Sequence, residues 1–440
     1  MLVRSRAPRA LHAGLGSTFH AEALPDALPR LQNNPRVAPY GLHTELLSGN
    51  AFTAPRAHNQ YSWMYRIRPS VQHTPRRFEP LRHRSWATPP FEVQTPAPLR
   101  LAPVEVCEGD WLDSVTTLAG NSGATAGVYA FRRGMGRRVF CHQDAELMLV
   151  PQQGALRLRT EFGPLSVGVG EVCLLPRGVR FAVDAEEAGA PHRGYVLENF
   201  GANFRVPELG PIGVSSGLAQ PRHFLAPEPA FEDAEARHEV VCKFGGQLFR
   251  GEIFFSPFDV VAWYGSLVPL KYDMSLFMSI NTVSFDHPDP SINTVVTSPS
   301  AEPGVANIDF VIFAPRWMAA ENTFRPPWFH RNYMSEYMGL VRGVYDAKPG
   351  AGFSPGCSTI HNRFTPHGPD AGATRAGQAG QDAPERYADT LAFMWESNQL
   401  WVPTAAAMEL ADATYADCWE NIPKTFDPKD PRTPPHPWRR

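Results

Sequence analysis

Short apolar segments, mostly bounded by proline or glycine, run through the whole chain and constrain its fold more than any other feature. Proline accounts for 44 of the 440 residues, about twice its usual ~5% share. Because proline ends helices and interrupts strand pairing, regular segments must be short. Short strands separated by many turns are typical of a β-sandwich or barrel. The windows with the strongest strand character are Ser62–Ile67, Ala155–Thr160, Glu171–Leu175 and Ile308–Phe313.

Helical patterns are sparse. The window Pro384–Asn398 combines an initial proline, an early glutamate and spaced apolar residues, and it predicts a short amphipathic helix. A second helix is expected within Ala405–Trp419. The alanine- and glycine-rich residues 371–385 are expected to form a mobile surface loop.

The chain is expected to be mainly β, with only a few short helices and more than one domain. Its length suggests two or three domains at roughly 100–200 residues each. A long apolar run ends at Lys271, and a new pattern interrupted by proline follows it. We therefore predict a large N-terminal β domain over residues 1–278 and a second domain over residues 279–440.

Charge and cysteine content exclude several functional classes. Lys and Arg total 41 and Asp and Glu total 44, so the net charge of −3 argues against a nucleic-acid or anionic-membrane partner. The longest uncharged run, Ser114–Phe131, is too polar to span a bilayer, and no apolar signal segment follows the N-terminal arginines. The six cysteines form no CxxC pair, which favours a reducing cytoplasm.

Two segments match the G-x-S-x-G pattern of a nucleophile elbow, Gly213–Gly217 and Gly352–Gly356. That elbow requires a strand before the serine and a helix after it. Prolines flank the first segment, and Pro355 follows Ser354 directly in the second. Both are better interpreted as glycine turns. No phosphate-binding glycine motif is present, and the arginine cluster between Arg76 and Arg84 is expected to be an exposed or inter-subunit surface.

Histidines near the C-terminal end carry the strongest chemical signal. His330 and Glu336 are six residues apart, a spacing that places both on one face if they share a strand. A third ligand is available from His361 or His367, and the spacing does not choose between them. Two histidines and one carboxylate with open positions are the ligand set of non-haem Fe(II) oxygenases. A single buried histidine is more often a core residue, but these histidines cluster beside a carboxylate.

Several long segments carry a specific resemblance. They are residues 41–71, 203–224, 281–295 (NTVSFDHPDPSINTV), 324–353 (FRPPWFHRNYMSEYMGLVRGVYDAKPGAGF) and 365–370 (TPHGPD). Together they resemble the homogentisate 1,2-dioxygenase family along nearly the whole chain. The resemblance implies a cupin-like β-sandwich or jelly-roll fold, with a large N-terminal β domain and a C-terminal cupin-like domain that holds one Fe(2+).

The resemblance also implies roles for individual residues. It makes His330, Glu336 and His367 the iron ligands, and it places His367 and Tyr345 against the substrate. His287, in Asp286-His287-Pro288, corresponds to the catalytic acid or base of the family. The chain departs from the family pattern at residues 14–23, which affects the N-terminal segment and leaves the metal ligands untouched.

The N-terminal domain resembles a cupin that lacks its metal. Its two cupin-like motifs contain His142 and Glu146, but Asp144 and Phe181 stand where histidines are expected. A structural role for His142 and Glu146 is therefore expected in place of a second iron site.

The expected function is cleavage of the homogentisate ring with O2 to give maleylacetoacetate, a step in tyrosine and phenylalanine catabolism. The resemblance implies a homohexamer, built as a dimer of trimers, and the expected location is cytoplasmic. Two alternatives remain open at this stage. One is a cupin dioxygenase for another aromatic acid such as gentisate, and the other is a non-catalytic cupin-like binding protein.

Overall fold

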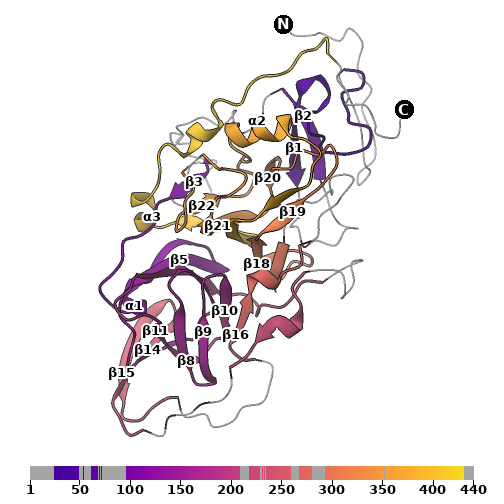
Figure 1. Ribbon diagram of the computed structural model, residues 1–440. Helices are drawn as coiled ribbons and strands as arrows, with labels where there is room; N and C mark the ends of the chain where they lie inside the picture. Colours follow the sequence, from indigo (N-terminus) through magenta and orange to yellow (C-terminus); the bar gives the residue numbers. More distant parts are fainter. Residues whose placement is uncertain are drawn as a thin grey trace.

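The fold is seen in a computed structural model (Figure 1). The residues it describes are 24–48, 53, 61–67, 69, 71, 96–208, 218–227, 230, 232, 234–258, 267–279, 293–350 and 352–430. No helix in this part of the chain is both long and apolar enough to cross a membrane.

Two sheets form a sandwich in the N-terminal half of the chain. The larger sheet has the order β13 (Phe224–Leu225), β16 (Leu270–Asp273), β10 (Glu171–Leu175), β7 (Glu146–Gln153), β12 (His192–Asn199), β5 (Ala124–Phe131), β4 (Thr116–Gly120) and β25 (Val402–Pro403). The smaller has the order β15 (Gln247–Ile253), β14 (His238–Phe244), β6 (Arg138–His142), β11 (Arg180–Ala185), β8 (Leu156–Thr160) and β9 (Gly163–Val167). Leu147 and Leu149 from the larger sheet share one core cluster with Phe140 and Phe181 from the smaller, and the short helix α1 (Trp111–Ser114) adds Trp111 to it.

A third sheet dominates the C-terminal half (Figure 1). Its order is β17 (Asn293–Pro299), β18 (Ala306–Phe313), β24 (Thr390–Ser397), β21 (Ser335–Gly343), β22 (Ser358–His361) and β3 (Leu99–Leu101). One face packs on the larger N-terminal sheet, because Phe310, Tyr337 and Trp395 belong to the same core cluster as Tyr195. The Tyr195 hydroxyl donates to the carbonyl oxygens of Leu340 and Cys357, at 3.0 and 2.9 Å.

The opposite face of this third sheet carries its polar residues. Side chains alternate between the two faces of a strand, so Glu336, Glu396 and Asp309 share the face that does not contact the N-terminal sandwich. They stand in one row across the strands, with Glu336 opposite Glu396 and Glu396 opposite Asp309. His361 extends the row on the other side of Glu336.

A small sheet with the order β2 (Tyr61–Arg66), β1 (His43–Ser48) and β20 (Phe329–Asn332) lies beside this face. Strand β1 runs parallel to β20, with Leu46 paired to His330. The polar face therefore receives one of its histidines from a separate sheet.

The four strand predictions are confirmed. The structure has β2, β8, β10 and β18 at those positions, with ends that differ by no more than two residues. The fold is mainly β with few short helices, as expected. The segment Gly352–Gly356 is a turn, with φ of +72° at Gly352 and +91° at Gly356. The first G-x-S-x-G segment and the arginine cluster lie outside the described residues.

The helix predicted over Pro384–Asn398 is wrong. These residues form β23 (Glu385–Tyr387), paired with β19 (Arg316–Met318), and then β24. Leu391, Phe393 and Trp395 point to one core cluster, whereas Ala392 and Met394 point to another. A strand buried on both faces has no polar side, so its sequence shows no alternation and resembles a helix.

The mobile loop predicted over residues 371–385 is wrong for its first nine residues, 371–379. Residues Ala371–Ala379 form helix α2, and Asp370 caps it by accepting a hydrogen bond from the Ala373 amide at 2.7 Å. A Cβ on Gly377 would lie 2.6 Å from the Phe324 ring. Glycine is therefore needed here because the helix packs closely against Phe324. The second predicted helix is confirmed in part, since Ala405–Trp419 contains helix α3 (Ala405–Glu409) and the 3₁₀ helix η6 (Tyr415–Trp419).

Candidate metal centre

His330 and Glu336 lie on two different strands. The expectation that they share one face of a single strand is therefore wrong. His330 is in β20, and Glu336 is the second residue of β21. The chain turns between them at Tyr333 and Met334, and the Asn332 side chain accepts a hydrogen bond from the Met334 amide at 3.2 Å. The two side chains therefore meet across a corner between two sheets.

His367 reaches the same place through backbone pairing with His330. The His330 amide donates to the His367 carbonyl at 2.9 Å, and the His367 amide donates back at 3.1 Å. This isolated antiparallel bridge holds the two imidazole centroids 4.1 Å apart. A segment that follows β22 thus supplies the third side chain.

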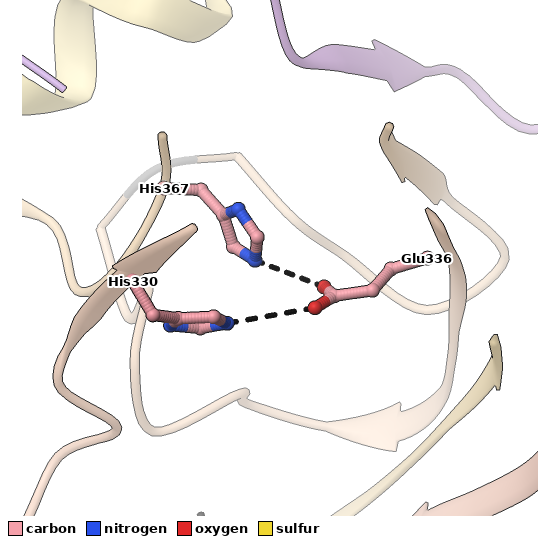
Figure 2. A group of neighbouring side chains, drawn as sticks. All are labelled: His330, Glu336 and His367. Atoms are coloured by element: carbon pink, nitrogen blue, oxygen red, sulfur yellow. Dashed lines mark hydrogen bonds and ion pairs between the residues drawn. The ribbon is translucent and has the colours of Figure 1, made fainter. Parts of the chain in front are cut away.

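Figure 2 shows both imidazoles pointing at the Glu336 carboxylate. His367 Nε2 lies 3.0 Å from Glu336 Oε2, and His330 Nε2 lies 3.5 Å from Oε1. One ligand atom from each of the three residues lies within 4.8 Å of the others. Within the described residues this is the one such group of three or more histidine, cysteine or acidic side chains.

The hydrogen bonds of the two imidazoles show why a cation fits between them and the carboxylate. Each ring donates its Nδ1 proton to a backbone carbonyl, His330 to Trp328 at 2.8 Å and His367 to Thr365 at 2.9 Å. In a neutral ring, Nε2 then carries a lone pair facing the carboxylate of Glu336. Burial lowers the pKa of His367 and favours that neutral form. Two acceptors facing each other are stable when a metal ion lies between them.

Glu336 supplies the carboxylate of the group. Its side chain is buried, and burial alone would raise the pKa of its carboxyl. The imidazoles of His367, His330 and His361 outweigh burial and hold that pKa well below its usual range. The Asn332 amide also donates to Oε1 at 3.4 Å. An ionised carboxylate that faces ring nitrogens favours a cation at this position.

His361 also contacts Glu336, but its hydrogen bonds differ from those of His330 and His367. Its Nδ1 lies 3.3 Å from Glu336 Oε2, and its Nε2 lies 2.8 Å from the Tyr415 hydroxyl. Burial, first, and the neighbouring His367 lower the pKa of His361 well below its usual value, so the ring is neutral. A neutral ring that donates from Nδ1 to the carboxylate must accept at Nε2 from Tyr415. Both nitrogens are thereby engaged by protein groups.

Three residues around the centre were not identified from the sequence: Asn332, Glu396 and Tyr415. Asn332 links two acids, because its amide also donates to Glu396 Oε1 at 3.0 Å. Burial, first, and then the charge of Glu336 raise the pKa of Glu396 well above its usual range. Glu396 was missed because its segment was predicted to be helical. The other two lack any distinguishing local pattern.

Tyr345 lies after β21 and is buried, with its ring packed against Phe313 and Phe353 at centroid distances of 5.5 and 5.9 Å. Burial raises the pKa of its phenol well above 10, and Asp346 and Glu336 add to this effect. The phenol is therefore a permanent hydrogen-bond donor near neutral pH. His287 lies outside the described residues.

The cupin-like motifs of the N-terminal half hold a different arrangement. His142 Nε2 contacts Glu198, and the same carboxylate oxygen lies 2.5 Å from Lys243 Nζ. Burial opposes ionisation of Glu198, but His142 and Lys243 lower its pKa to about 2. Glu146 instead accepts from the Phe204 amide at 2.8 Å. These contacts support the structural role expected for His142 and Glu146.

Comparison with solved structures gives distant likenesses, of which two are described here. The protein Ylba from E. coli is 10% identical over 70% of this chain and 94% of its own, with a TM-score of 0.34. A cupin 2 conserved barrel domain protein from Leptotrichia buccalis is 7% identical over 66% of this chain and 91% of its own, with a TM-score of 0.30. Likenesses this weak do not bear on function.

Comparison with protein families is decisive. Residues 10–274 match the family model described as homogentisate 1,2-dioxygenase N-terminal. Residues 275–426 match the model described as homogentisate 1,2-dioxygenase C-terminal. The two halves of one family follow each other without a gap, and the candidate metal centre lies within the second. The chain therefore belongs to the homogentisate 1,2-dioxygenase family of metal-dependent, ring-cleaving oxidoreductases.

Proposed function

We propose that this chain is an Fe(II) dioxygenase that opens the aromatic ring of homogentisate with O2 and releases maleylacetoacetate, in tyrosine and phenylalanine catabolism. The observation that carries the proposal is the convergence of His330, Glu336 and His367 in a chain matched by both family models. Two imidazoles and one carboxylate, with positions left for substrate, suit non-haem Fe(II).

His330 Nε2, one oxygen of Glu336 and His367 Nε2 would hold the iron. Their outer contacts suit this task, because metal-binding histidines usually donate their second ring proton to a carbonyl or carboxylate. Here both Nδ1 protons go to backbone carbonyls. When bound, Fe(II) supplies the charge that favours a phenolate and the electron chemistry that O2 requires.

The protein residues bind the aromatic acid and move its proton. His287 would accept the phenolic proton, since an unperturbed imidazole with a pKa of ~6.5 exchanges protons near neutral pH. Tyr345 would donate a hydrogen bond to the bound substrate, and His367 would lie against it. The protonated state of Tyr345 supports its assignment as a donor.

We also propose a homohexamer, arranged as a dimer of trimers, in the cytoplasm. The exposed hairpin of β14 and β15 supports association, because Phe244, Leu248 and Phe249 are each 57–61% exposed. Phe254 and Phe255, which follow β15, are 65% and 54% exposed. Exposed apolar side chains in such number on one hairpin suit an interaction surface. All six cysteines are free, as expected in a reducing compartment.

Oxygen uptake by the Fe(II)-loaded enzyme tests the proposal and its nearest alternative. Uptake should be fast with homogentisate and slow with gentisate. Faster uptake with gentisate would transfer the assignment to that acid. A protein that retains no iron and consumes no oxygen with either acid would instead be a binding protein.

A further inference from the structure

Lys348 is a buried lysine close to the metal centre. It lies on the loop after β21, where its amide donates to the Tyr345 carbonyl at 3.0 Å. Only 4% of the residue is exposed. Its ammonium lies 5.8–5.9 Å from the ring centroids of Tyr345, Tyr415 and Trp419. Three aromatic rings thus surround this ammonium group.

The ammonium has no anionic partner of its own in the described part of the chain. No ion pair or hydrogen bond of Lys348 Nζ occurs there. The nearby Asp370 carboxylate is engaged as the cap of α2, accepting from the Ala373 amide at 2.7 Å. Burial raises the pKa of the Cys418 thiol to about 11, so Cys418 is neutral. An unpaired buried ammonium is costly unless an anion joins it.

Contacts from residue to residue connect Lys348 to the metal ligands. Tyr415 lies between them: its ring faces Lys348, and its hydroxyl contacts His361, which in turn contacts Glu336. Burial lowers the pKa of Lys348, while Cys418, Glu336 and Asp370 oppose that effect. Lys348 is therefore within electrostatic range of the metal centre without being bound to it.

Other cations near this position already have carboxylate partners. Arg100 Nε lies 3.1 Å from Asp412, and Arg316 lies 2.8 Å from Asp346. Lys348 differs from these two arginines, because no carboxylate of the described residues forms an ion pair with its ammonium. The proposed substrate brings both a ring for the metal centre and a carboxylate on a short arm.

We propose that Lys348 binds the carboxylate of the aromatic acid and so selects acids over neutral phenols. This inference rests on the proposed function and adds a specificity-determining residue to it. Burial of the lysine strengthens its attraction for a carboxylate, because charges interact more strongly where little water screens them. Tyr345 and Lys348, three residues apart on one loop, would contact the same substrate molecule.

Binding measurements under anaerobic conditions test this role without catalysis. The probes are homogentisate and its methyl ester, titrated into Fe(II)-loaded wild type, Lys348→Met and Lys348→Arg. Lys348→Met should weaken homogentisate binding by on the order of 30- to 1,000-fold, as expected when a desolvated charge pair loses one partner. It should leave ester binding unchanged, and Lys348→Arg should recover part of the loss. Equal losses for acid and ester, or no loss, would overturn the inference.

Lys271→Met is the matched control, because Lys271 already pairs with Glu171 at 2.8 Å in the N-terminal sandwich. It should bind both probes as wild type does. The thermal midpoint of Lys348→Met should not fall, since the substitution removes an unpaired buried charge. A lower midpoint would show that the Lys348 ammonium stabilises the fold, and would contradict the inference. If the variant does not fold, wild type alone decides, because equal affinity for acid and ester would overturn the proposal.

Failure of this inference is distinguishable from failure of the proposed function. Wild type that consumes oxygen with homogentisate while Lys348→Met binds it normally would overturn the role of Lys348 alone. Wild type that neither binds nor oxidises homogentisate would overturn both.

Discussion

His361 stands directly opposite Glu336 on the neighbouring strand, and its Nδ1 lies 3.3 Å from Glu336 Oε2. Its Nε2 lies 2.8 Å from the Tyr415 hydroxyl, and we therefore propose that His361 orients the carboxylate and does not bind the metal. The sequence spacing does not choose between His361 and His367, whereas their hydrogen bonds differ.

Alanine substitutions should separate metal ligands from their supports. His330→Ala, Glu336→Ala and His367→Ala should each remove most of the bound iron and nearly all activity while the fold persists. His361→Ala should retain iron better than His367→Ala, with a loss in affinity or activity of roughly 10–100-fold, as for residues that orient a ligand. Iron per chain, measured by elemental analysis, checks these results.

His142→Ala is the control, since His142 contacts Glu198 in the N-terminal half and should not affect iron content. Near-native iron in Glu336→Ala would refute the ligand assignment.

Several strands could be predicted from the sequence, and the predictions failed where tertiary packing determines the secondary structure. The strand Glu171–Leu175 has the same ends in the structure, because its short apolar run is bounded by glycine and proline. The strand containing Glu396 was predicted to be a helix, because both of its faces are buried. Helix α2 was predicted to be a loop, because the small residues that permit close packing also occur in flexible segments.

At the candidate metal site, too, the residue types could be predicted from the sequence but their spatial arrangement could not. The residue types in Phe329–Glu336 indicate a metal, but the spacing suggested one strand where the structure has two. No local pattern reveals the turn at Asn332 or the approach of His367, because both depend on pairing between distant segments. Lys348 gave no signal at all, because burial of a lysine is a property of the folded chain.

His287→Gln should separate chemistry from metal binding. Glutamine keeps a hydrogen-bonding side chain of similar reach but cannot take up a proton near neutral pH. Iron content should stay close to that of wild type, and turnover should fall by the ~10²–10⁴-fold typical of losing a general acid or base. Iron content, thermal midpoint and single-turnover rate should be measured on one sample. Unchanged turnover per iron, with lowered stability, would make His287 a structural residue.

Asp309→Asn should stabilise the protein in a pH-dependent way. Burial raises the pKa of Asp309 from 3.8 to about 6 in the folded chain. Below pH 3.8 the acid is protonated in both states and costs nothing. Between pH 3.8 and 6 only the unfolded state ionises, so wild type loses stability, up to about 3 kcal/mol at ~1.4 kcal/mol per pH unit.

The uncharged asparagine avoids this loss, so the variant's gain in thermal midpoint should be larger at pH 8 than at pH 5. Equal midpoint differences at the two pH values would show that Asp309 does not have a raised pKa.

Light scattering should return a mass about six times the 48.7 kDa of one chain for a closed dimer of trimers. The exposed apolar surface of the β14–β15 hairpin gives the physical reason, because it requires cover in a soluble protein. A monomer mass for active enzyme at working concentration would contradict the hexamer.

Anaerobic loading with Fe(II), followed by a measured pulse of O2 in the presence of homogentisate, tests the central claim most directly. The account predicts one O2 consumed per homogentisate, no hydrogen peroxide, and a product whose mass equals that of the substrate plus both oxygen atoms. Glu336→Ala treated in the same way should give no product. A product that gains one oxygen atom, or that loses two hydrogens with release of peroxide, would contradict ring cleavage by this metal centre.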